Sequence, residues 1–102
     1  MHAVLITFQS TVELDSLAGP FTDYAHALTT VPGLVTKTWL QDGATLGGFH
    51  LFTGRAAAET YLNGTMAAGI TANPAFGEFR IQHFSVLEEL SRITGTWQLA
   101  GA

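Results

Sequence analysis

Charged residues are scarce in this chain of 102 residues. Only 12% of its residues are charged, whereas a typical soluble domain has about 25%. A small domain with so few charges exposes apolar surface to water, and such surface usually marks an interface. We therefore expect the protein to associate with copies of itself.

The sign of the charge and the absence of cysteine exclude several classes of protein. Four Lys and Arg against eight Asp and Glu give a net charge of −4, which is not the basic footprint of a nucleic-acid binder. Without cysteine, the chain has no disulfide framework, zinc–thiolate site, iron–sulfur cluster or cysteine nucleophile. The four histidines lack the carboxylate spacing of a zinc site or an iron facial triad, so no metal is expected.

Long hydrophobic runs are also missing, although 47% of the residues are hydrophobic. No run approaches the ~20 residues that a membrane span needs. The apolar opening segment over 1–10 has neither a basic n-region nor a small-residue cleavage site. We therefore expect a cytoplasmic protein without membrane contacts, folded as one domain over 1–102.

Hydrophobic periodicity predicts four strands and two main helices. The clearest alternation places Val35, Lys37 and Trp39 on one face of a strand, with Leu34 on the other. The predicted elements are a strand over 3–10, a connection with helical character over 11–18, a helix over about 20–30, strands over 34–41 and 45–53, a helix over 54–62 with further turns over 65–71, a strand over 77–87 and a short helix over 88–93.

Turn and cap residues mark the boundaries of these elements. Pro20 suits a first helical turn, and Thr53 is a suitable N-cap for the alanine-rich helix. Asp42-Gly43 is a strong turn signal that joins two strands into a hairpin. Gly47-Gly48 indicates a bulge or a backbone that another group approaches closely.

The order β-α-β-β-α-β predicts a ferredoxin-like α+β fold, in which an antiparallel sheet carries both helices on one face. The strands nevertheless place apolar and aromatic side chains on both faces, so the second face is also expected to be buried. Two such sheets can stack and close a shared barrel. The chain is therefore predicted to form a two-fold homodimer.

Three stretches of the sequence carry a resemblance to a known family: PGLVTKTWLQD (32–42), GGFHLFTGRAAAETYL (47–62) and FRIQHFSVLEELSRITG (79–95). They resemble the YdhR-type putative mono-oxygenases, which belong to the dimeric α+β barrel superfamily. The resemblance covers about three-quarters of the chain in order and spacing, and it is weak over 11–31. Its signatures mostly specify the fold.

This resemblance implies oxygen insertion into an aromatic or polyketide-like substrate without metal or flavin. The superfamily also includes cyclases, isomerases, dehydratases and haem-degrading enzymes, and fold similarity alone does not choose among them. We expect no cofactor. Haem ligated by a lone histidine is an alternative, but no feature of the sequence demands it.

Two histidines, His50 and His83, lie in the middle of predicted strands. Histidine is the usual side chain for moving protons near neutral pH. A phenol or β-dicarbonyl substrate must lose a proton to become an anion that can reduce O₂ directly. Either residue is a candidate base, and either could equally be a buried core or interface histidine.

Lys37 is the only lysine of the chain and lies on one strand face with Trp39. In a barrel lumen Lys37 would bind an anionic oxygen, and Trp39 with Phe52 would stack on the ring. The alternative is a lysine whose stem covers the sheet edge, beside a tryptophan of the core. Candidates for the mouth of a pocket are Tyr24, Tyr61 and Trp97, which could also be core residues.

These residues lead to one preferred function and two alternatives. The preferred function is a cofactor-independent mono-oxygenase with an aromatic or polyketide-like substrate in a hydrophobic lumen. A non-redox cyclase or isomerase would use the same base. A non-catalytic dimer would only bind the ligand.

Overall fold

The computed structural model describes residues 1–95 and contains a four-stranded sheet with four helices. In chain order the elements are β1 (His2–Ser10), α1 (Leu14–Leu28), β2 (Leu34–Asp42), β3 (Thr45–Phe52), α2 (Arg55–Leu62), α3 (Thr65–Thr71), β4 (Phe76–Ser85) and α4 (Glu88–Thr94).

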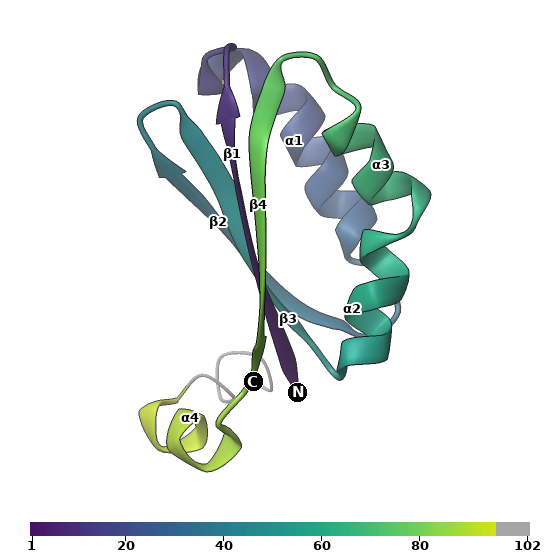
Figure 1. Cartoon of the computed structure of the whole chain (residues 1–102), viewed down its shortest axis with the longest axis vertical. Helices are drawn as coiled ribbons and strands as arrows, with labels where there is room; N and C mark the ends of the chain where they lie inside the picture. The colour runs from purple at the N-terminus through teal and green to yellow at the C-terminus, as the bar shows by residue number, and fades with distance from the viewer. Residues whose placement is uncertain (96–102) are drawn as a thin grey trace.

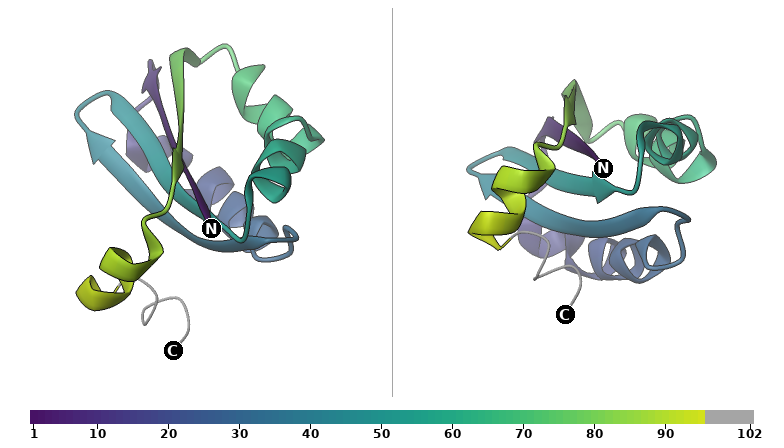
Figure 2. Two further views of the ribbon diagram at one scale, coloured as in Figure 1. Left: turned by 60° about the horizontal axis from the view of Figure 1, so that its bottom comes forward. Right: turned by 90° about the horizontal axis from the view of Figure 1, so that it is seen from below.

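The strands pair in the order β2-β3-β1-β4, and every pair is antiparallel. Helices α1, α2 and α3 cover one face of this sheet (Figure 1). The short helix α4 lies apart from them, beyond the end of β4 (Figures 1 and 2). The predicted ferredoxin-like α+β fold is confirmed.

Alternate residues of β1 point to the helix-covered face, as its period of two requires. Val4 packs in a buried cluster with Phe52 and residues of α1 and α2. Phe8 packs in a second buried cluster with Leu46 and residues of α1 and β4. Ile6, between them on the same strand, packs against both clusters. The core is therefore a layer between the sheet and its own helices.

Helix α1 begins earlier than the sequence predicts. It starts at Leu14, so Pro20 lies inside the helix rather than in its first turn. Proline lacks the N–H that would bond the carbonyl four residues earlier. That carbonyl belongs to Ser16, which is exposed and can be hydrated. The cost of an interior proline is thereby reduced.

Two local predictions about β2 and α2 are wrong. The sequence predicted Leu34 on the face opposite Lys37. The pairing of β2 with β3 shifts register between Leu34 and Thr36, and this shift places Leu34 in the helix-side core, on the same face as Lys37. The N-cap of α2 is Gly54 rather than the predicted Thr53, and no side chain caps the helix.

Apolar side chains remain exposed on the sheet face away from the helices, called the open face below, and on α4. Phe49 and Phe84 are 38% and 47% exposed on the open face, and Ile93 of α4 is 81% exposed. Among the described residues, no helix is long and apolar enough to cross a membrane.

The close approach predicted at Gly47 is found, and it gives a test of the fold. A Cβ at Gly47 would overlap the backbone oxygen of Ile6 in the neighbouring strand. We expect Gly47→Ala to lower the free energy of unfolding by about 2–3 kcal/mol, because β1 and β3 must separate.

The matched control is Gly69→Ala in α3, where an added Cβ meets nothing within 4 Å. This change should stabilise the protein by about 0.5–1 kcal/mol, because alanine favours the helix. Urea denaturation measures both variants. Equal stabilities of the two variants would contradict this account of the strand contact.

Candidate functional site

A cavity of about 330 Å³ lies between the sheet and the helices that cover it. The side chains that line it come from both core clusters and from β2, β3 and β4. Its apolar walls include Phe8, Phe21, Leu46, Ile70, Phe79 and Ile81. Apolar cavities of this size with a few polar groups are typical small-molecule sites.

Lys37 brings a positive charge into these apolar walls. Its Nζ lies 3.6 Å from the centroid of the Trp39 ring and 5.4 Å from that of Tyr24. Within residues 1–95, no acidic side chain forms an ion pair with it. Burial lowers the pKa of the Lys37 ammonium to about 8, because an apolar environment disfavours the charged form.

Gly48 makes room for the lysine stem. Gly48 lies opposite Trp39 in the sheet, and a Cβ on it would lie 2.5 Å from Cε of Lys37 and 3.1 Å from Cε1 of His50. Any other residue at this position would force the lysine stem to shift. The signal in the sequence was the glycine pair, but it did not reveal which group approaches.

His50 of β3 lies opposite Lys37 in the sheet register and also lines the cavity. Its Nδ1 is 3.2 Å from the carbonyl oxygen of Val4. A carbonyl can only accept, so Nδ1 carries the hydrogen and Nε2 carries the lone pair. Nε2 is fully buried and has no hydrogen-bond partner among the described residues.

The environment of His50 keeps the ring neutral. Burial, and then the charge of Lys37, lower its pKa to about 4. The ring stacks on Phe52 at an interplanar angle of 9° and also contacts Tyr61. His50 is therefore a fixed, uncharged imidazole with an unsatisfied acceptor.

Two tyrosines from different helices meet at the cavity wall. The hydroxyls of Tyr24 in α1 and Tyr61 in α2 are 2.6 Å apart. Burial raises the pKa of both phenols. The pair therefore stays protonated at neutral pH, and both tyrosines line the same cavity as Lys37.

The structure brings together four of the predicted site residues besides His50, and leaves others elsewhere. The four are Lys37, Trp39, Tyr24 and Tyr61. The sequence prediction placed Lys37 and Trp39 in a lumen between two sheets, whereas the structure places them on the side of the chain's own helices.

The remaining candidates do not line the cavity. Nδ1 of His83 is 2.8 Å from Nε2 of His2; His83 lies across β1 from His50, because both pair with Val4, but it does not line the cavity. Phe52 is 0% exposed in the core, where it supports His50. Trp97 lies outside the described residues. The pairing of His2 with His83 was missed, because it depends on strand register.

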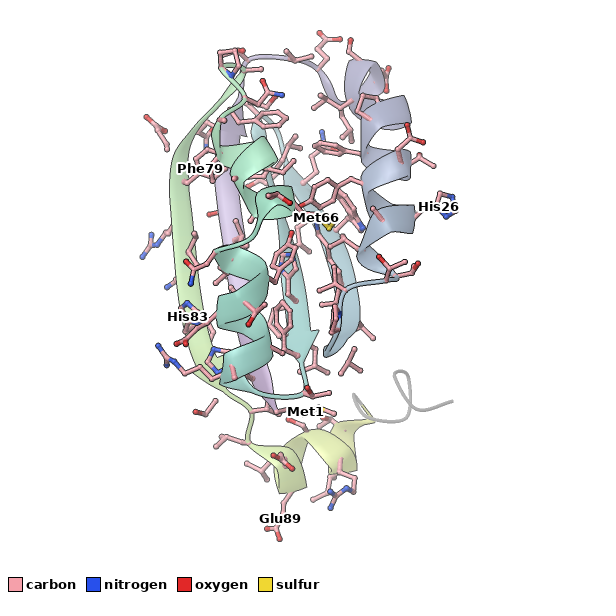
Figure 3. The ribbon with its side chains drawn as sticks, turned by 90° about the vertical axis from the view of Figure 1, so that its right-hand side faces the viewer. Met1, His26, Met66, Phe79, His83 and Glu89 are labelled. Atoms are coloured by element: carbon pink, nitrogen blue, oxygen red, sulfur yellow. The ribbon has the colours of Figure 1, made fainter. Side chains whose placement is uncertain are left out.

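Other histidines and metal ligands add nothing to the site. His26 projects from α1 away from the sheet (Figure 3). No group of three or more His, Cys, Asp or Glu side chains among residues 1–95 could hold a metal ion. The polar groups that line the cavity are therefore one amine, one imidazole and two phenols, together with Gln41 and Thr71, among aromatic and aliphatic walls.

Solved structures similar to this chain share its fold. The protein NE2512 from Nitrosomonas europaea, of unknown function, is 24% identical over 84% of this chain and 88% of its own, with a TM-score of 0.64. SnoaB from Streptomyces nogalater, a cofactor-independent oxygenase, is 16% identical over 85% and 93%, with a TM-score of 0.69. The haem-degrader MhuD from Mycobacterium tuberculosis is 17% identical over 85% and 96%, with a TM-score of 0.66.

No curated protein matches the chain. A family model does: residues 4–96 match the model described as "Putative mono-oxygenase ydhR". The match spans most of the chain, including every strand of the sheet apart from the first two residues of β1. The resemblance seen in three stretches of the sequence is thereby confirmed, and the chain belongs to the ydhR putative mono-oxygenase family.

Proposed function

We propose that the protein is a cofactor-independent mono-oxygenase that oxidises an aromatic or polyketide-like phenol in the cavity between its sheet and helices. The observation that carries the proposal is the unpaired Lys37 ammonium among aromatic walls, next to the unsatisfied Nε2 of His50. Family membership supports the same class of reaction.

Binding would begin with the anionic or acidic oxygen of the substrate at Lys37. A buried cation without a partner is unfavourable, so an oxyanion in the cavity would supply the missing counter-charge. The Trp39 ring beside Lys37 offers a flat apolar surface to the substrate ring. Anionic, ring-shaped ligands are therefore preferred over neutral ones.

His50 would take the proton of the substrate. Its basic nitrogen is Nε2, because Nδ1 is held by the carbonyl of Val4. Once an oxyanion neutralises Lys37, the second cause of the low His50 pKa disappears, and the imidazole becomes a stronger base. Nε2 is buried in the empty cavity, so transfer requires the contacts to tighten around bound substrate, as catalytic hydrogen bonds often do.

The oxidation itself needs only the substrate anion and O₂. The anion passes an electron to O₂, and the two radicals combine at the activated carbon. For a hydroxyanthrone, a CH₂ group becomes C=O; one oxygen atom enters the product and the other leaves as water. The substrate supplies all four electrons, so no reductant is needed.

Haem fits the site poorly. His50 is the only histidine at the cavity within residues 1–95, and the Lys37 charge that disfavours a proton on its ring would disfavour an iron ion there as well. No step is therefore assigned to haem. A cyclase or isomerase with the same base, or a dimer that only binds the ligand, are the alternative functions, and the tests below separate them.

A second copy of the chain would cover the open face of the sheet. Phe49 and Phe84 are exposed there. Helix α4 extends beyond the sheet (Figure 2), and Leu90 and Ile93 on it are exposed, as is Leu87 just before it. The low proportion of charged residues fits a buried surface. A two-fold pairing of open faces would leave each cavity within its own chain.

The oxygenase reaction is tested with 1,8-dihydroxyanthrone and an oxygen electrode. We expect one O₂ consumed per product and no turnover under argon. His50→Gln keeps the size of the side chain but cannot take the proton, so kcat should fall at least about 100-fold. The control is His83→Gln, because His83 lies on the same sheet face but does not line the cavity. This variant should keep the rate within about twofold.

Turnover at the same rate under argon would favour an isomerase, because 1,8-dihydroxyanthrone has already closed rings and offers nothing to cyclise. Saturable quenching of tryptophan fluorescence without turnover would favour a binding protein. Equal rates for the two histidine variants would overturn the assignment of His50 as the base.

The role of Lys37 predicts a pH dependence of binding. A hydroxynaphthoquinone that is an anion throughout pH 6–10 should bind only when Lys37 is protonated. Its dissociation constant should rise about tenfold per pH unit above pH 8, where the free ammonium titrates. Lys37→Met should bind weakly at every pH. An affinity that is flat from pH 7 to 10 in the unsubstituted protein would contradict the ion pair.

Dimerisation is tested by sedimentation equilibrium. The protein should sediment at twice its 10.9 kDa mass, and Phe49→Glu or Ile93→Glu should produce monomers. Ala27→Glu adds the same charge on exposed α1 and should leave the dimer intact. Monomeric variants should still bind the naphthoquinone, and a monomeric unsubstituted protein would contradict the proposed interface.

A further inference from the structure

The lysine of the cavity has the features of a nucleophile as well as those of an anion site. Lys37 is the only lysine in the chain. Its amine lies in an apolar cavity, next to the rings of Trp39 and Tyr24, and no acidic group within residues 1–95 pairs with it. An acidic partner would keep the amine charged; its absence leaves the neutral amine accessible. Desolvation in an apolar pocket is one of the ways in which proteins activate lysine.

The tyrosine pair can supply a hydrogen-bond donor to a carbonyl compound bound beside that amine. Two hydroxyls that share one hydrogen bond use only one of their two hydrogens. The other hydroxyl hydrogen has no acceptor among the described residues. It can donate to a carbonyl oxygen bound in the cavity and polarise the carbon towards attack.

We propose that Lys37 captures aromatic aldehydes and ketones in the cavity as imines. The amine lone pair attacks the carbonyl carbon, and the oxygen takes up a proton to give a carbinolamine. The nitrogen gives up two protons in all: the first balances the proton taken up by the oxygen, and the second passes to the hydroxyl, which leaves as water. One C=N bond replaces one C=O bond, without an oxidant or reductant.

This activity does not rest on the oxygenase reaction, because it uses the neutral amine and no O₂. Oxyanion binding needs the ammonium instead. Burial makes both forms available near pH 8, where about half of the lysine is neutral. Imine formation should therefore increase over the pH range in which anion binding decreases.

The test is reductive trapping with 1-naphthaldehyde and sodium cyanoborohydride at pH 7.5, followed by peptide mass spectrometry. The variant Ala68→Lys adds a second lysine on an exposed position of α3, with no charged residue three or four positions away. Both lysines then compete in one molecule. We expect Lys37 to be labelled at least about tenfold faster than the introduced lysine, and Lys37→Arg to abolish that label.

A second measurement uses the unsubstituted chain alone. Labelling of Lys37 in the folded protein is compared with its labelling in 6 M urea, where the cavity no longer exists. The proposal requires faster labelling in the folded protein. If Lys37 reacts no faster than the introduced lysine, or no faster when folded than when unfolded, the proposal is overturned.

Discussion

The ammonium group of Lys37 lies among aromatic rings with no acidic partner in the described chain, and the properties of the site depend on this constraint. The fall of its pKa from 10.5 to about 8 corresponds to a desolvation cost on the order of 3 kcal/mol. The same charge helps to keep His50 neutral. A ligand that brings an oxyanion into the cavity would remove this desolvation cost. The free energy lost when Lys37 is buried on folding is regained only when an anion binds, and this makes the site selective for anions.

The two faces of the sheet have different roles. The helix-covered face holds the cavity, and the glycine pair of β3 makes that possible. Gly47 lets β1 approach, whereas Gly48 leaves space for the lysine stem. The open face and α4 carry the exposed apolar side chains. The cavity lies on the helix-covered side of the sheet, so association through the open face would stabilise the protein and leave the cavity in place.

The sequence predicted the element order, the strand alternation and the family, because these depend on local periodicity and short motifs. It also placed Lys37 and Trp39 on one face. It could not predict which side of the sheet holds the cavity, since a period of two does not distinguish the sides. The register shift near Leu34 and the pairing of His83 with His2 depend on contacts between distant strands. Alternation likewise could not show that Phe52 supports His50 from the core rather than facing a ligand.

The most direct measurement is the titration of Lys37 by NMR. Because the chain has a single lysine, protein labelled with ¹³C at lysine Cε gives one side-chain signal, whose shift follows protonation of the amine without assignment. The account predicts a midpoint near pH 8 in the free protein and a higher midpoint with a bound hydroxynaphthoquinone anion. A midpoint above pH 10 in the free protein would show a solvated lysine and contradict the account.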